Sequence, residues 1–177
     1  MKKCYFLIGL PGVGKSTITK KILEEEKNSV YLSTDYFLEQ IAQEKSIDYN
    51  KAWKEHGKDA DKKFTALLKS SMNKGSVLIW DQTNVVKSSR IKKLRNLKEK
   101  GYVVIGLNFE IPEEEWKQRL VKREQQGGKK IAKFILNTMK KSYERADYDE
   151  GFDEIFLINE HSQLTLLEKK ITLNMKI

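Results

Sequence analysis

The sequence predicts an α/β fold in which a five-stranded parallel sheet is sandwiched between helices. Two observations support this prediction. Short apolar runs of strand length alternate with segments of helical periodicity along most of the chain. The runs are apolar throughout instead of alternating with polar residues, which is typical of a sheet covered on both faces. A chain of 177 residues, of which 39% are hydrophobic, can bury one core, so we expect a single domain over residues 1–177.

The elements are expected in the following order along the chain. The strands cover residues 4–8, 30–33, 77–80, 102–109 and 154–158. The helices cover residues 17–26, 36–44, 60–74 and 91–100, with further helices after Pro112 and through Ile131, Ile135, Met139 and Tyr143. Gly75 and Gly101 are natural helix stops. Residues 45–58 are polar and mixed, which favours a loop or a weak helix. The tail, about residues 160–177, shows helical spacing early.

Charge and cysteine content restrict the partners and the compartment. The net charge is +9, and the stretch from Lys117 to Lys141 holds nine basic residues and one acid. Such a segment favours a polyanionic partner, although a solvated lysine-rich helix face gives the same pattern. One cysteine excludes an internal disulfide. No segment is long enough to span a membrane, so we expect a cytoplasmic protein without a membrane partner.

Residues 9–17 match the phosphate-binding pattern G-x-x-x-x-G-K-[S/T] at every defined position. A strand precedes the pattern and a helix follows it, which is the context of a P-loop and predicts the P-loop NTPase fold. Lys15 can reach terminal phosphates, and the Ser16 hydroxyl can ligate Mg²⁺. The residues expected to contact the nucleotide are Gly9, Pro11, Gly12, Val13, Gly14, Lys15, Ser16 and Thr17.

Two carboxylates follow predicted strands, and the carboxyl ends of parallel strands face the ligand site. Asp81 ends an apolar strand as a Walker B aspartate does, and can hold Mg²⁺ or position Ser16; a simple strand-end cap is the alternative. Asp35 follows the second strand. It can accept a proton from an attacking hydroxyl, as the general base of a kinase does, and it can also cap the helix that starts at Tyr36.

Two arginines mark a lid, expected over about residues 112–134. Arg119 and Arg123 lie four residues apart on one helix face, before a break at Gly127 and Gly128. A mobile lid of this kind brings guanidinium groups onto the transferring phosphoryl group. We expect Arg123 to act in catalysis and Arg119 to contact the nucleotide; ordinary surface arginines are the alternative.

The order of these motifs resembles phage-type 5′-hydroxyl polynucleotide kinases. The P-loop, Asp35, Asp81-Gln82-Thr83-Asn84 with Arg90, and Arg119-x-x-Lys122-Arg123 occur in the order and approximate spacing of that family, over residues 1 to about 158. The resemblance implies that Lys15 and Ser16 serve ATP and Mg²⁺, that Asp35 is the general base, and that Arg123 is the lid arginine. It also implies a nucleic-acid 5′ end as acceptor and a tendency to form homo-oligomers.

One position departs from that family. The family has an arginine three residues after the base, where it contacts the acceptor phosphate, whereas this chain has Leu38. Either another basic residue, such as Arg90 or one near residues 51–58, replaces that arginine, or the acceptor is different. A kinase of a small metabolite or nucleoside is therefore an alternative. Residues 82–84 and 152–155 also resemble the P-loop domain of heterogeneous nuclear ribonucleoprotein U-type proteins, which leaves a non-catalytic, nucleotide-regulated RNA-binding module open.

Overall fold

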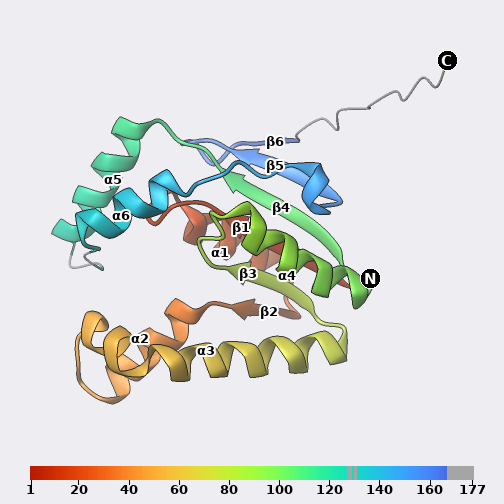
Figure 1. The fold of residues 1–177 in the computed structure, drawn as a ribbon, viewed down its shortest axis with the longest axis horizontal. Coiled ribbons are helices and arrows are strands. Elements are labelled where there is room, and N and C mark those ends of the chain that lie inside the picture. The colour runs from red at the N-terminus through yellow and green to blue at the C-terminus, as the bar shows by residue number, and fades with distance from the viewer. Residues whose placement is uncertain (127–128, 130, 167–177) are drawn as a thin grey trace.

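The computed structural model describes residues 1–126, 129 and 131–166. It contains one six-stranded sheet in the order β2-β3-β1-β4-β5-β6 (Figure 1). The first five strands pair in parallel, and β6 pairs with β5 antiparallel. The expected α/β fold is therefore confirmed, with one more strand than predicted.

The strands are β1 (Lys3–Ile8), β2 (Ser29–Leu32), β3 (Val77–Asp81), β4 (Val103–Phe109), β5 (Glu154–Ile158) and β6 (Leu164–Leu166). The α-helices are α1 (Lys15–Glu25), α2 (Thr34–Glu44), α3 (Tyr49–Lys74), α4 (Lys87–Glu99), α5 (Glu113–Gln125) and α6 (Lys133–Lys141). A 3₁₀ turn, η1, covers Tyr148–Glu150. Within the described residues, no helix has the length and apolar character needed to cross a bilayer.

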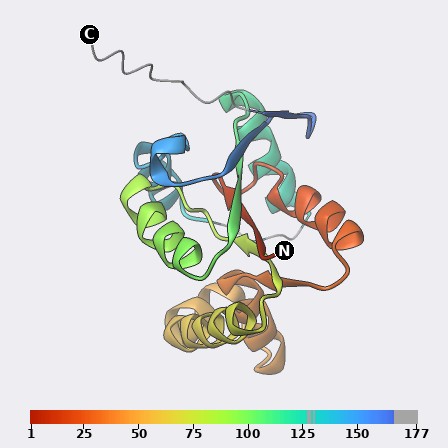
Figure 2. The same ribbon diagram turned by 90° about the vertical axis from the view of Figure 1, so that its right-hand side faces the viewer.

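Each face of the sheet buries its own apolar cluster. On one face, Phe6 and Trp80 of the sheet pack with Phe64 of α3 and Leu94 of α4. On the other face, side chains of α1 and α5, including Ile18 and Trp116, cover the sheet. Figure 2 shows α1 and α4 on opposite sides of the twisted sheet. This two-sided cover explains why the central strands are apolar throughout.

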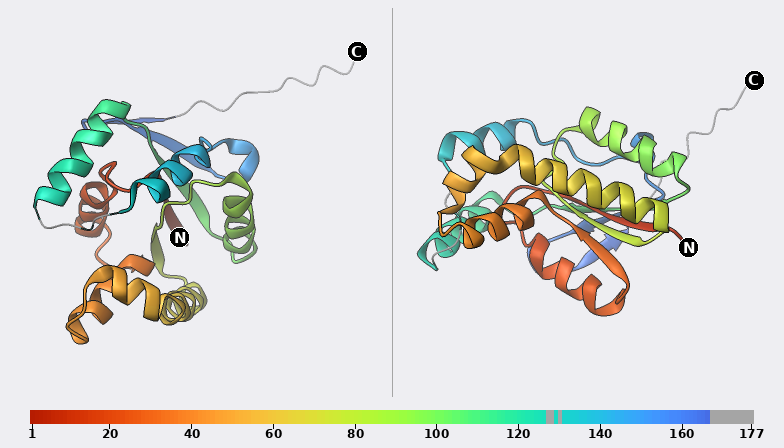
Figure 3. Two further views of the ribbon diagram at one scale, coloured as in Figure 1. Left: turned by 60° about the vertical axis from the view of Figure 1, so that its left-hand side comes forward. Right: turned by 90° about the horizontal axis from the view of Figure 1, so that it is seen from below.

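Helices α2 and α3 form a hairpin beside the β2 edge of the sheet (Figure 3). Of the loop or weak helix expected over residues 45–58, the structure has a loop over residues 45–48 and a helix from Tyr49, where α3 begins and continues without a break. Asp48 caps its first turn, where Oδ1 accepts a hydrogen bond from the backbone of Lys51 at 3.0 Å. Gly75 ends it in the left-handed conformation at φ 69°, as predicted. A polar sequence therefore formed a helix because of its cap and its packing on α2.

Two other predictions near the C-terminus need correction. Part of the tail forms β6, an edge strand beyond β5, and not a helix. Helix α6 covers only Lys133–Lys141, so Ile131 and Tyr143 lie outside it. The predicted break at Gly127 and Gly128, and residues 167–177 of the tail, lie outside the described residues.

A buried ion pair joins α4 to η1. The Arg90 and Glu150 side chains are both fully buried. Arg90 Nε and Nη2 donate to the two carboxylate oxygens of Glu150 at 2.6 and 2.7 Å. Arg90 Nη1 donates to the carbonyls of Asn84 and Val85, and Nη2 also donates to that of Arg145. This one guanidinium therefore fixes the loop after β3 against the chain that precedes β5.

We expect Arg90→Met to lower the free energy of unfolding by about 3–5 kcal/mol, because it leaves the Glu150 carboxylate buried without its partner. Urea denaturation followed by circular dichroism measures this change. Lys87→Met is the matched control, since it removes the exposed Lys87–Asp149 pair between the same two elements and should change stability far less. Equal effects of the two substitutions would contradict the structural role of Arg90.

Candidate functional site

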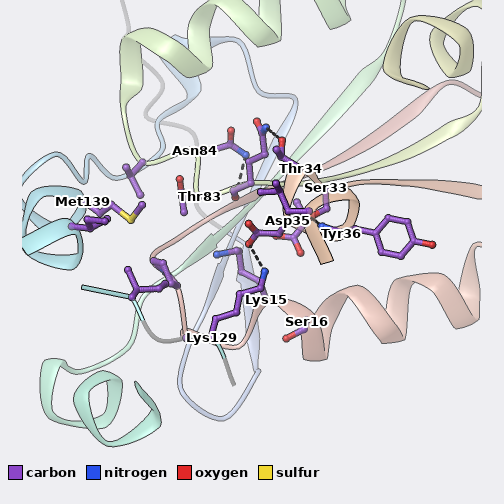
Figure 4. Close-up of a pocket in the computed structure, with 18 of the residues that line it drawn as sticks. Lys15, Ser16, Ser33, Thr34, Asp35, Tyr36, Thr83, Asn84, Lys129 and Met139 are labelled. Atoms are coloured by element: carbon purple, nitrogen blue, oxygen red, sulfur yellow. Dashed lines mark hydrogen bonds and ion pairs between the residues drawn. The ribbon is translucent and has the colours of Figure 1, made fainter. Parts of the chain in front are cut away.

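A cleft of about 1160 Å³ opens at the carboxyl ends of the parallel strands. The phosphate loop, the start of α2, the start of α3, the loop after β3 and the segments around α5 and α6 all contribute to its walls. Figure 4 shows Lys15, Asp35 and Lys129 pointing toward one another, with Met139 on the opposite wall. The cleft exceeds the usual volume of a pocket for one small ligand, about 300–1000 Å³, so it has room for two substrates.

The phosphate loop has the backbone that its glycines allow. Gly12 and Gly14 have φ angles of +85° and +103°, in the left-handed region that disfavours other residues. Lys15 Nζ donates to the carbonyls of Gly9 and Leu10 at 2.9 and 3.1 Å. Burial lowers the pKa of Lys15, and the nearby carboxylates of Asp81 and Asp35 oppose that shift. The loop therefore carries a partly buried cation in a cradle suited to phosphate oxygens.

Helix α5 packs directly on this loop. Trp116 Nε1 donates to the Pro11 carbonyl at 2.7 Å. Arg119 Nη1 donates to the Val13 carbonyl at 3.2 Å, and its other nitrogens bind Glu115 and the backbone of Glu160. Arg119, which is expected to contact the nucleotide, therefore lies against the phosphate loop. Helix α5, which carries it, falls in the segment expected to form a lid.

Arg123 lies one turn further along α5 and lines the same cleft. Within the described part of the chain, its guanidinium forms no hydrogen bond or ion pair. It is close enough to Lys15 to lower the pKa of that amine slightly, as like charges do. An uncommitted guanidinium beside the phosphate loop is free to bind an anionic group.

Asp35 lies at the start of α2, on the opposite side of the cleft from the loop. Ser33, not Asp35, caps this helix, because Ser33 Oγ accepts from the backbone of Tyr36 at 3.3 Å. The Asp35 carboxylate instead accepts a hydrogen bond from the Tyr49 hydroxyl and lies 3.3 Å from Lys129 Nζ. The side chain remains 63% exposed, so one edge of the carboxylate faces the cleft.

The sequence does not predict the two residues that bind Asp35, which are Tyr49 and Lys129. Tyr49 lies in the stretch expected to be a loop or a weak helix, and its ring centroid lies 4.0 Å from Lys129 Nζ. Lys129 also pairs with Glu39 at 2.8 Å. Lys129 fell within the basic segment from Lys117 to Lys141, but nothing in that pattern distinguishes it from its neighbours. Its role depends on contacts between residues distant in the sequence.

Asp81 ends β3 beside the phosphate loop, as expected. Its Oδ2 accepts a hydrogen bond from the Tyr31 hydroxyl at 2.8 Å. Burial raises the pKa of the Asp81 carboxyl, while Lys15 and the Tyr31 hydroxyl act in the opposite direction. A carboxylate and the exposed Ser16 hydroxyl at the start of α1 are hard oxygen donors of the kind that Mg²⁺ prefers. The described residues contain no cluster of three or more His, Cys, Asp or Glu side chains able to hold a metal by themselves.

The structure also explains the departure at position 38. Leu38 is 1% exposed and packs in a cluster with Ile41 and Ala60, which joins α2 to α3. An arginine at this position would lose that packing. Arg90, which could replace the missing arginine in binding the acceptor phosphate, is fully buried and bound to Glu150. The hypothesis that Arg90 contacts the acceptor is therefore wrong.

Comparisons with known proteins show what the chain is similar to. A family model described as an AAA domain matches residues 5–146. An L-seryl-tRNA(Sec) kinase of Methanococcus maripaludis is 29% identical over 191 residues, which cover 93% of this chain and 69% of that protein.

Two solved structures share the fold. A protein of the PezAT chromosomal toxin-antitoxin system of Streptococcus pneumoniae matches with a TM-score of 0.68 at 19% identity, over 93% of this chain and 70% of that one. A fungal RNA kinase matches with a TM-score of 0.57 at 18% identity, over 97% of this chain and 40% of that one.

The contact between α5 and the loop yields a prediction. A Cβ atom on Gly12 would lie 2.9 Å from Leu120 Cδ2, so we expect Gly12→Ala to disturb the packing of Leu120 on the loop and to weaken binding of Mg·ATP by more than about tenfold, or about 1.4 kcal/mol. Isothermal titration calorimetry measures the affinity.

Gly101→Ala is the control, because Gly101 also has a positive φ of +76° but no heavy atom within 4 Å of the added methyl group. Both substitutions incur a backbone penalty of about 1–2 kcal/mol, and only Gly12→Ala should lose nucleotide affinity. Combining Gly12→Ala with Leu120→Ala should restore part of it. Equal affinities of the two single variants would show that the contact has no influence on the loop.

Proposed function

Since the chain belongs to the AAA domain family of P-loop kinases, we propose that it transfers the γ-phosphoryl group of ATP to a hydroxyl carried by a nucleic acid. The observation that carries this proposal is the position of Asp35. The cleft is lined by the phosphate loop on one side and by this exposed carboxylate on the other. A protein that only hydrolyses a nucleotide has no need of a carboxylate on the acceptor side.

In the proposed reaction the acceptor hydroxyl attacks the γ-phosphorus of ATP. Its proton passes to Asp35, a bond forms between the acceptor oxygen and phosphorus, and the bond from phosphorus to the β,γ-bridging oxygen breaks to release ADP. Lys15 and Arg123 neutralise the charge on the transferring group. Bound Mg²⁺, held through Ser16 and Asp81, would neutralise charge on the β- and γ-phosphates.

The neighbours of Asp35 fit a role in proton transfer. The Tyr49 hydroxyl and the Lys129 ammonium both lie against the carboxylate. Both interactions fix the orientation of the carboxylate, which a general base needs in order to meet the proton that it accepts. Because the two partners come from α3 and from the segment after α5, the carboxylate is held from two sides.

Three observations favour a nucleic acid as the acceptor. The tRNA kinase and the RNA kinase to which this chain is similar both bear the names of enzymes that act on RNA. The basic segment from Lys117 to Lys141 borders the cleft through Arg123 and Lys129, which favours a polyanion. Trp53 of α3 lines the cleft with its side chain 61% exposed, which suits stacking on a base. Within this class we favour a 5′-hydroxyl end.

One observation supports a second candidate, a kinase of a small metabolite or nucleoside. The wall formed around α6 is apolar and contributes Ile131, Ala132, Ile135 and Met139 to the cleft. Such a wall suits a compact acceptor with an apolar surface. A nucleotide-regulated RNA-binding module without phosphotransfer is the third candidate.

An acceptor screen separates the three candidates. Transfer of label from [γ-³²P]ATP is measured with 5′-OH RNA and DNA oligonucleotides, seryl-tRNA and a panel of nucleosides. Product with an oligonucleotide or a tRNA supports the proposal. Product with nucleosides alone favours the metabolite kinase. Salt-dependent RNA binding without any product favours the binding module.

We expect Asp35→Asn to lower kcat by about 10²–10⁴-fold, because the amide cannot accept the proton, while the affinity for Mg·ATP changes little. Initial rates with the acceptor found in the screen, together with calorimetric titration of ATP, check both expectations. Glu39→Gln is the matched control, since Glu39 lies one turn away on α2 and shares Lys129. A similar loss of kcat in both variants would indicate that only the electrostatics around Lys129 matter and would refute proton transfer to Asp35.

A further inference from the structure

Lys93 of α4 lines the cleft, although no sequence motif distinguishes it from other lysines. Its Nζ donates to Gln82 Oε1 at 2.9 Å and to Asn84 Oδ1 at 2.7 Å. It also lies 5.5 Å from the centroid of the Trp80 ring. An ammonium group has three donors, so one N–H of Lys93 remains after these two hydrogen bonds.

Among the described residues, the charge of Lys93 has no counter-ion. No carboxylate among the described residues lies within ion-pair distance of its Nζ, and its polar partners are neutral amides. Two other cations of the cleft do have carboxylate partners, because Lys129 pairs with Asp35 and Arg119 pairs with Glu115. Lys15 and Arg123, beside the phosphate loop, have none among the described residues. Burial lowers the pKa of Lys93 to about 8. A partly buried cation that is not paired within the protein is suited to an anionic ligand.

Lys93 lies on the acceptor side of the cleft. Gln82, which accepts a hydrogen bond from Lys93, donates through Nε2 to Thr34 Oγ1 at 2.9 Å. Thr34 directly precedes Asp35 at the start of α2. Ser89, one turn before Lys93 on α4, also lines the cleft and offers a hydroxyl on the same helix face. Two hydrogen bonds therefore connect the Lys93 ammonium to the residue next to Asp35.

We propose that Lys93 binds the phosphate group nearest to the accepting hydroxyl, and so performs from α4 the task for which Leu38 on α2 is unsuited. This inference rests on the proposed function, since it assumes a nucleic-acid acceptor. The buried ion pair of Arg90 fixes the backbone of Asn84, and Asn84 in turn binds Lys93. The ammonium is thus held in place before the acceptor arrives.

The test removes one charge from the acceptor and one from the protein. The protein, as residues 1–177, is saturated with Mg·AMP-PNP, which fills the donor site. Two 5′-OH RNA oligonucleotides are then titrated into the complex. They differ only in the linkage that follows the first nucleotide, which is a phosphodiester in one and a neutral methylphosphonate in the other. We expect the wild-type protein to bind the phosphodiester about 10- to 100-fold more tightly, as for a hydrogen bond to a charged group. Absence of a preference would overturn the inference without any mutation.

Lys93→Met should reduce this preference to near unity, whereas Lys93→Arg should retain most of it. Lys92→Met is the matched control, because Lys92 is exposed on the same helix and does not line the cleft. The Lys92→Met protein should prefer the phosphodiester as strongly as the wild-type protein does. Thermal unfolding checks that each variant is folded, and Lys93→Gln replaces the methionine variant if that one is not. A folded neutral variant that keeps the preference would show that Lys93 only organises Gln82 and Asn84.

The binding measurement also separates this inference from the proposed function. A preference that depends on Lys93, together with no transfer of label to any acceptor, would refute the kinase proposal and leave the phosphate site standing. Transfer of label together with a preference that is independent of Lys93 would support the kinase proposal and refute the phosphate site at Lys93.

Discussion

The acceptor half of the cleft depends on the buried ion pair between Arg90 and Glu150. A buried charge is unfavourable unless its partner and its hydrogen bonds are complete, and here the guanidinium binds both carboxylate oxygens and three backbone carbonyls. Two of those carbonyls belong to Asn84 and Val85, at the point where Asn84 adopts a left-handed φ of 49°. The Asn84 amide then donates to the Leu7 carbonyl of β1 at 2.7 Å. The floor of the cleft is therefore fixed by contacts made far along the chain.

The donor half of the cleft could be predicted from the sequence because its determinants are local. The phosphate loop, its strand and its helix are contiguous, so the pattern over residues 9–17 specifies both chemistry and geometry. Asp81 was found by the same logic, since the carboxyl ends of neighbouring parallel strands meet at one edge. Gly75 was identified as a helix stop for a comparably local reason, its left-handed backbone.

The acceptor half could not be predicted in the same way, because its determinants are long-range. The part of α3 over residues 49–58 depends on packing against α2, and its polar sequence shows no clear periodicity, unlike residues 60–74. Lys93 and Lys129 look like ordinary surface lysines in the sequence, and only the folded chain shows which amide or carboxylate each one meets. Arg90 was considered for the acceptor because of its place in a motif, whereas tertiary contacts bury it completely. The strand β6 forms only because β5 offers it an edge.

One contact of α5 links the nucleotide site to the far edge of the sheet. Arg119 donates both to the Val13 carbonyl in the phosphate loop and to the Glu160 carbonyl in the turn between β5 and β6. In the proposed role of Arg119, phosphate oxygens would draw this guanidinium toward the loop and would thereby also act on the β5–β6 turn. Because coupling between sites is reciprocal, ordering that turn would then change nucleotide affinity by the same factor by which the nucleotide orders the turn. Hydrogen exchange at the amides of the β5–β6 hairpin would in that case report whether the phosphate loop is occupied.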